Sequence, residues 1–149
     1  MANEIPSPEN YAGLSRLVLQ YVDSANRIFE KLKQGEVSET DWASLEELVN
    51  VENFQRVGIF LTDKVEVITW QQYKETIKQF GRMFSWEGTF RRITEVPGLV
   101  LLELEERNTI EGVMDVSNTV TIYEFDQTDK IIKLDVYVAH LEKRQLGIG

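Results

Sequence analysis

The period of the hydrophobic pattern changes once along the chain, near Phe84, and this change limits the possible folds more than any other feature. Before Phe84, most apolar residues recur at three- and four-residue steps, as in helices with one buried face. After Phe84, apolar and polar residues alternate, as in strands with one buried face. Helices followed by consecutive strands predict an α+β fold, in which three N-terminal helices pack on a curved antiparallel sheet.

The first expected helix has the strongest pattern. Its apolar stripe consists of Tyr11, Leu14, Leu17, Val18, Tyr21, Val22, Ala25, Ile28, Phe29 and Leu32. We expect Ser7 to be the N-cap and Pro8 to occupy the first helical position, because these residue types favour those positions. Gly35 is expected to end the helix in a left-handed conformation.

Two further helices and one strand are expected before Phe84. Thr40 is the predicted N-cap of a short helix over residues 41–49. Residues 54–61 are typical of a strand. Thr69 and Gln72 have the spacing of a capping box, which predicts a third helix that ends near residue 83.

Four strands are predicted in the second half, over residues 86–96, 99–107, 114–125 and 130–141. The short connections between them contain turn-forming residues, so we expect an antiparallel meander. In the last strand, the residues assigned to the helix-covered face are Ile132, Leu134, Val136 and Val138. The residues assigned to solvent or to a second subunit are Ile131, Lys133, Asp135 and Tyr137.

The composition is that of one folded domain over residues 1–149, with its core at about residues 7–141. The net charge of −9 opposes binding to nucleic acid or to an anionic membrane, so neither partner is expected. The chain has no cysteine, which excludes disulfides and a cysteine nucleophile. With one histidine and no glycine-rich phosphate loop, we expect no metal and no cofactor. No export signal or membrane span is recognisable, so a cytoplasmic protein is expected.

The order of these elements, together with the segment FDQTDKIIKLDVY at residues 125–137, resembles the nuclear-transport-factor-2-like superfamily, in its SnoaL-like and ketosteroid-isomerase-like branch. The likeness runs from about Tyr11 to Leu141. It implies a cone-shaped, cystatin-like fold whose helices and curved sheet enclose a pocket, and commonly a homodimer through the open face of the sheet. The superfamily contains isomerases, cyclases and hydrolases as well as non-catalytic binding modules, so the fold does not define the function.

The catalytic residues of known enzymes with this fold do not carry over to this chain. The tyrosine and the two acids of ketosteroid isomerase fall on Ile28, Arg56 and Thr121. Of the catalytic positions of limonene epoxide hydrolase, one keeps an acid, Glu106. Scytalone dehydratase needs two histidines, and this chain has one. These chemistries are disfavoured, while Arg56 and Thr121 are kept as candidate ligand-binding residues.

The register of the first predicted hairpin selects two of three catalytic candidates. With a turn at residues 97–98, the expected cross-strand pairs are Arg92 with Glu103, Arg91 with Leu104, and Thr89 with Glu106. This pairing puts Arg91 and Glu106 on the inner face. Glu106 is then a candidate general acid or base, and Arg91 a candidate group for holding an anionic or carbonyl oxygen.

His140 is the third catalytic candidate. It is in phase with the inner face of the last strand and is suited to proton transfer near neutral pH. An alternative stays open for each acid–base candidate. Glu106 is then part of a solvated turn, and His140 is a hydrogen-bonded residue at the end of the sheet.

Five aromatic residues are candidates for the walls of a ligand pocket: Tyr21, Trp70, Trp86, Phe90 and Tyr123. Core packing is the alternative role for each of them.

Two hypotheses of function remain. In the first, a largely apolar pocket binds a small apolar or carbonyl-bearing molecule, with acid–base catalysis of an isomerase, cyclase or hydrolase type left open. In the second, the protein is a non-catalytic, dimeric interaction module whose cone is filled by its own aromatic residues. A homodimer is expected from the apolar residues Val120, Ile122, Ile131 and Tyr137, which alternate onto the open face of the sheet.

Overall fold

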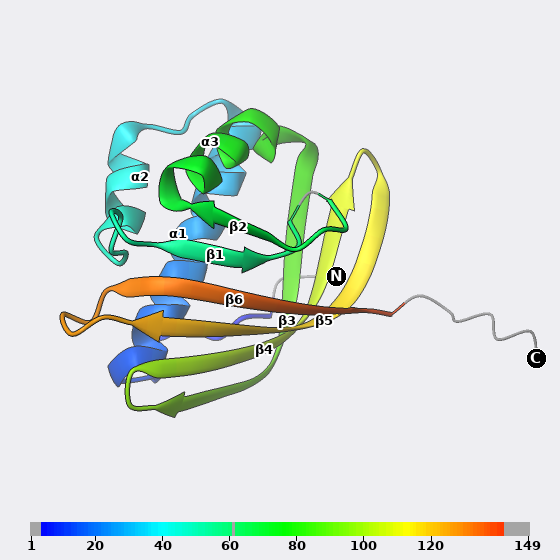
Figure 1. Ribbon diagram of the computed structural model, residues 1–149. Helices are drawn as coiled ribbons and strands as arrows, with labels where there is room; N and C mark the ends of the chain where they lie inside the picture. The colour runs from blue at the N-terminus through cyan, green and yellow to red at the C-terminus, as the bar shows by residue number, and fades with distance from the viewer. Residues whose placement is uncertain (1–3, 61, 142–149) are drawn as a thin grey trace, which may run out of the picture.

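A curved six-stranded sheet lies against three helices in the computed structural model, which describes residues 4–60 and 62–141 (Figure 1). The helices are α1 (Gly13–Gln34), α2 (Glu39–Glu46) and α3 (Trp70–Phe80), and the two 3₁₀ turns are η1 (Pro8–Asn10) and η2 (Gly81–Met83). The strands are β1 (Gln55–Gly58), β2 (Glu66–Thr69), β3 (Phe84–Val96), β4 (Leu99–Ile110), β5 (Val113–Phe125) and β6 (Ile131–His140). The predicted α+β class is confirmed. Within the described residues, no helix is long and apolar enough to cross a bilayer.

The sheet has the strand order β2-β1-β6-β5-β4-β3. Strands β3 to β6 form the predicted antiparallel meander. Strand β1 adds to it in parallel with β6, and β2 pairs antiparallel with β1. The sequence did not predict β2, because its four residues are too few to show an alternating pattern. The strand predicted over residues 54–61 is shorter, since β1 ends at Gly58; Leu61 lies outside the described residues.

Helix α1 begins at Gly13, so the predicted cap at Ser7 is wrong. Ser7 precedes the 3₁₀ turn η1, and its side chain makes no capping hydrogen bond. The start of α1 is capped instead by Glu95 of β3. One carboxylate oxygen of Glu95 accepts hydrogen bonds from the backbone N–H and the hydroxyl of Ser15, each at 2.7 Å. A carboxylate satisfies free N–H groups at a helix start and also opposes the helix dipole.

The predicted N-cap of α2 is also wrong, because Ser38 and not Thr40 occupies that position. The backbone N–H of Ser38 donates to Asp41 at 2.8 Å, which forms a capping box. The helix therefore starts at Glu39 and ends at Glu46, earlier than predicted at both ends.

Two other predicted helix ends are confirmed. Gly35 follows α1 in the left-handed conformation, with φ 72° and ψ 20°. Thr69 caps α3, and its backbone N–H donates the reciprocal hydrogen bond to the Gln72 side-chain oxygen at 2.9 Å. The helix passes into η2, which ends at Met83 as expected for the third helical segment.

A β-bulge at Arg91 shifts the predicted register of the hairpin between β3 and β4. Near the turn the prediction is right, since Arg92 opposes Glu103. Beyond the bulge, Phe90 and not Arg91 opposes Leu104. The extra residue of a bulge changes which side chains share a face, and Arg91 is consequently directed to the outer face.

The alternating pattern predicted Ile131 on the outer face of the sheet, and this prediction is wrong. Ile131 lies in the core. A second register shift, next to Phe125, pairs Phe125 with Ile131. Ile131 also forms a bridge with Val49, and its side chain is 0% exposed. The irregular start of β6 therefore removes one apolar residue from the open face of the sheet.

The inner face of the sheet, defined as the face toward α1, determines what the helices enclose. Its residues on β4 are Val100, Leu102, Leu104, Glu106 and Asn108. Those on β5 are Asp115, Ser117, Thr119, Thr121 and Tyr123, and those on β6 are Leu134, Val136, Val138 and His140. The hairpin of β4 and β5, yellow in Figure 1, rises to the level of α3 and extends this face beyond the packed core.

Replacing Glu95 with Gln is expected to lower the free energy of unfolding by about 1 kcal/mol, the usual value of a helix cap. The bonds from Ser15 hold the pKa of the Glu95 carboxyl below its usual range. A lowered pKa means that the stabilisation is complete above the pKa of the unfolded chain and is lost as pH falls through the folded value. Urea unfolding between pH 7 and 3 measures both effects.

Glu52→Gln is the matched control, because Glu52 is exposed and is not a helix cap. The stability difference between the two variants should be largest at neutral pH and should shrink in acid. Equal stability of the two variants at pH 7 would show that Glu95 does not hold the start of α1.

Candidate functional site

A cavity of about 390 Å³ lies between the helices and the inner face of the sheet, and we call it the cone cavity. Helix α1 contributes Tyr21, Val22, Ala25, Asn26 and Phe29 to its lining. Arg56 of β1, Ile59 and Phe60 after it, and Tyr73 of α3 also line it. From the sheet, the lining residues include Phe84, Trp86, Ile110, Val113 and the inner-face residues Leu102 to Asn108, Asp115 to Tyr123 and Leu134 to His140. Most of this lining is apolar, and the ionisable side chains gather in two places.

The first group, which we call the acid end, consists of Trp86, Glu106, Asp115 and His140. Glu106 opposes Ser117 on β5, and Ser117 opposes His140 on β6. The three residues therefore form one row across three neighbouring strands, with Ser117 in the middle. This row brings the two predicted acid–base residues, Glu106 and His140, to the same cavity.

Trp86 holds the Glu106 carboxylate by a hydrogen bond from its indole N–H. Glu106 opposes Gly88 on β3, and not Thr89 as predicted. A Cβ atom at Gly88 would lie only 2.8 Å from the Trp86 ring, so this glycine leaves the space that the indole occupies. The bond fixes the position of the Glu106 carboxylate on the cavity wall.

His140 has a carboxylate partner that the sequence did not reveal. Its Nδ1 lies 3.1 Å from a carboxylate oxygen of Asp115. Such a bond orients the ring and favours the tautomer in which Nε2 is the atom that exchanges a proton. Asp115 alternates in phase with Ser117 and the inner face of β5, but only the pairing of β5 with β6 shows that it meets His140.

The second group, which we call the arginine end, consists of Arg56, Tyr73 and Tyr123. Leu134 opposes Tyr123 on one side and Arg56 on the other. Tyr123, Leu134 and Arg56 therefore form a second row across the sheet, and Tyr73 faces this row from α3. The Arg56 guanidinium carbon lies 4.7 Å from the centre of the Phe60 ring and 5.6 Å from that of Tyr73. Sequence reasoning missed Tyr73, because a single tyrosine on a helix carries no signal of what it faces.

The buried tyrosines of the cavity keep their protons at neutral pH. Burial raises the pKa of Tyr21 and of Tyr123 well above the usual value, and the neighbouring Tyr73 adds to both shifts. The rings of Tyr21 and Tyr123 meet edge to face, with centroids 5.9 Å apart. The Tyr21 hydroxyl is fully buried and makes no hydrogen bond of ordinary geometry with the described residues, although Tyr73 lies close enough to affect its pKa.

Three predicted site residues lie away from the cone cavity. Arg91 is on the outer face, where it forms an ion pair with Glu105 at 2.9 Å. Trp70 is fully buried in the core, and its indole N–H donates to Glu46 at 2.7 Å. Phe90 packs against Tyr11, with ring centroids 6.4 Å apart. The β-bulge in β3 explains why Arg91 points to the outer face. Trp70 and Phe90 have the alternative role that was left open for them, which is core packing.

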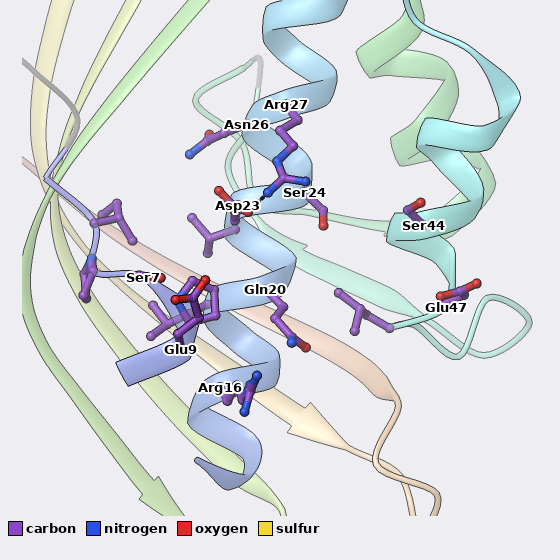
Figure 2. Close-up of a pocket in the computed structure, with 16 residues that line it drawn as sticks. Ser7, Glu9, Arg16, Gln20, Asp23, Ser24, Asn26, Arg27, Ser44 and Glu47 are labelled. Atoms are coloured by element: carbon purple, nitrogen blue, oxygen red, sulfur yellow. Dashed lines mark hydrogen bonds and ion pairs between the residues drawn. The ribbon is translucent and has the colours of Figure 1, made fainter. Parts of the chain in front are cut away.

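A larger hollow of about 730 Å³ lies outside the cone, between the N-terminal segment, α1 and α2 (Figure 2). All of its labelled side chains are polar, and Asp23 and Arg27, one turn apart on α1, form an ion pair at 2.6 Å. Among the described residues, its lining contains no buried polar atom without a partner, whereas the lining of the cone cavity includes Tyr21. The cone cavity is therefore the better candidate site. No group of three His, Asp or Glu side chains in the described part of the chain is placed to hold a metal ion.

Comparison with known proteins finds similarity of structure alone. No protein-family model and no curated protein matches the sequence. A protein from Shewanella putrefaciens described as a SnoaL-like polyketide cyclase is 9% identical, with a TM-score of 0.60 over 93% of this chain and 91% of that one. A nuclear-transport-factor-2-like protein of unknown function from Cytophaga hutchinsonii is 14% identical, with a TM-score of 0.53 over 87% and 92%. An LEH-like epoxide hydrolase from M. tuberculosis is 12% identical, with a TM-score of 0.54 over 80% and 83%.

Proposed function

We propose that this chain, which has the nuclear-transport-factor-2-like fold, binds a small and largely apolar molecule in the cone cavity and acts on it by acid–base chemistry. The observation that carries the proposal is a cavity of about 390 Å³ that has both Glu106 and His140 on its wall. This volume is within the range of small-molecule sites, which are mostly apolar and have a few convergent polar groups. A polyketide cyclase and an epoxide hydrolase among the similar structures support a small organic substrate.

The proposed roles follow from how each group is held. Glu106, fixed by the Trp86 indole, takes a proton from the bound molecule or gives one to it. His140, oriented by Asp115, is the partner that moves a proton in the opposite direction. Two proton-transfer groups on one row suit reactions such as isomerisation, cyclisation or hydrolysis, in which a proton leaves one atom and another arrives elsewhere.

The alternative of a cone filled by its own aromatic residues has less support. Of Trp86, Phe90 and Tyr123, which were expected to fill it, Phe90 is absent from the cavity lining. Trp86 and Tyr123 form parts of the wall and leave the space between them. An open cavity of this size favours a bound molecule over a purely structural role.

We also propose that the outer face of the sheet is the surface through which two copies of the chain associate. Tyr137 is 61% exposed there, and it opposes Val120 on the neighbouring strand. A shallow hollow of about 320 Å³ lies beside them and is lined in part by Arg91. Exposed aromatic and aliphatic side chains with an arginine at the edge are typical of protein interfaces.

Filling the cavity should abolish binding of a neutral apolar probe. The wild-type protein is expected to bind 1-naphthaleneacetamide, and Thr121→Trp, which places an indole in the cavity, should weaken that binding by more than about tenfold. Isothermal titration calorimetry measures the affinity. Thr94→Trp, at an exposed position of β3, is the control and should bind as the wild type does. If Thr121→Trp binds the probe normally, the cone cavity is not the binding site.

A charge on the outer face should separate the two copies. Sedimentation of the wild-type chain is expected to give twice the 17.3 kDa mass of one chain. Tyr137→Glu should give the single-chain mass, because two like charges would face each other in a two-fold interface. Val65→Glu, at a position that is 71% exposed outside this face, should leave the dimer intact. A wild-type protein that sediments as one chain at all concentrations contradicts the proposed interface.

A further inference from the structure

The cone cavity contains a buried cation without a counter-ion. Arg56 is 8% exposed, and among the described residues no carboxylate lies within ion-pair distance of it. Its only hydrogen bond to the described residues joins Nη1 to the Ile59 carbonyl oxygen at 3.0 Å. A guanidinium group has five N–H donors, so most of its hydrogen-bonding capacity is unused.

The unused donors of Arg56 are open to the cavity. None of its nitrogen atoms is both fully buried and without a partner, and the side chain lines the cavity wall. The Phe60 and Tyr73 rings lie within cation–π distance of the guanidinium and limit the directions from which a ligand can reach it.

Burial of an unpaired charge is costly, because the charge loses its hydration and gains no ionic partner. Replacement of such a group by an apolar side chain of similar volume is often neutral or stabilising. The contacts with the Phe60 and Tyr73 rings and the one bond to Ile59 still leave most of the guanidinium donors unused, so stability of the empty protein is by itself a weak reason for an arginine at this position. A ligand that brings a negative charge does explain it.

The neighbouring hydroxyl groups suit the same ligand. Tyr73 and Tyr123 line the cavity beside Arg56, and the Tyr73 side chain also lies next to that of Tyr21. Because the Tyr123 hydroxyl keeps its proton, it can donate to an anionic oxygen. The nearest acid of the cavity, Glu106, is already bonded to Trp86 and is not paired with Arg56.

We propose that the molecule bound in the cone cavity is a carboxylate, whose two oxygens bind the Arg56 guanidinium with Tyr73 and Tyr123 as further donors. This inference rests on the proposed function and names the class of its ligand. The guanidinium fork matches a carboxylate with two parallel hydrogen bonds.

The two ends of the cavity also define the shape of this ligand. Between the row of Tyr123 and Arg56 and the row of Glu106 and His140, the inner face of β5 has only Thr121 and Thr119. The apolar side chains Leu102, Leu104, Val136 and Val138 flank this stretch. The ligand is therefore a carboxylate with an apolar body, and its reacting atoms lie at the end away from the carboxylate.

A pair of probes that differ in charge tests this inference. 1-Naphthaleneacetate and 1-naphthaleneacetamide have nearly the same shape, and only the first is an anion at neutral pH. Calorimetry at one ionic strength should show that the wild-type protein binds the acetate about tenfold more tightly or better, as expected for a charge-assisted hydrogen-bonded pair. Equal affinities overturn the carboxylate inference and leave the proposed function standing. Absence of binding by both probes contradicts the proposed function, and the inference with it.

Two variants locate the preference at Arg56. Arg56→Met keeps an unbranched apolar side chain and removes the charge, so the preference for the acetate should disappear while the amide still binds. Arg56→Gln, which keeps an amide donor for Ile59, should show the same loss if the Met variant folds poorly. Arg82→Met is the control, because Arg82 is exposed and lies outside the cavity lining. A preference for the acetate that survives in both Arg56 variants overturns the inference.

Discussion

The unbroken register between β4 and β5 is the constraint on which the site depends. The pairing continues without a bulge from Leu99 and Glu124 to Ile110 and Val113. Because successive side chains of a strand point to opposite faces, a slip of one residue would move every inner-face residue of one strand to the outside. The regular register is therefore what puts Glu106 beside Ser117 and keeps both in the cavity.

The cavity combines an apolar middle with ionisable groups at its two ends. This arrangement differs from the surface, where most of the excess negative charge of the chain lies in turns and loops, because acids and bases balance within the three helices. Inside, one cation lies at the arginine end and two carboxylates and a histidine lie at the acid end. Such a distribution orients an elongated ligand in one direction only, since its charged and reacting ends meet different partners.

The sequence was sufficient to predict the fold class, the meander and the likeness to the nuclear-transport-factor-2-like superfamily, which is confirmed at the level of the fold. These features depend on long stretches with a constant hydrophobic period, and a bulge or an irregular strand end changes only a few residues of such a stretch. The inner position of Glu106 and His140 was predictable for the same reason. The bulge changed the partner of Glu106 from Thr89 to Gly88, but Glu106 stayed on the inner face because it alternates in phase with Leu102 and Leu104 on β4.

The errors come from single residues whose environment is tertiary. A bulge that the sequence does not mark turned Arg91 outward. Ser7 is a good cap by type, but Glu95, which is distant in the sequence, provides the cap. The pairing of Asp115 with His140 likewise requires the cross-strand register. Local patterns show which face a residue is on, and they do not show which partner it meets there.

A crystal structure of the protein with 1-naphthaleneacetate would show both where the probe binds and how it is oriented. We expect the carboxylate on the Arg56 guanidinium, with the rings beside Thr121 and directed toward Glu106. A probe found only in the hollow between α1 and α2, or only on the outer face of the sheet, would contradict this expectation.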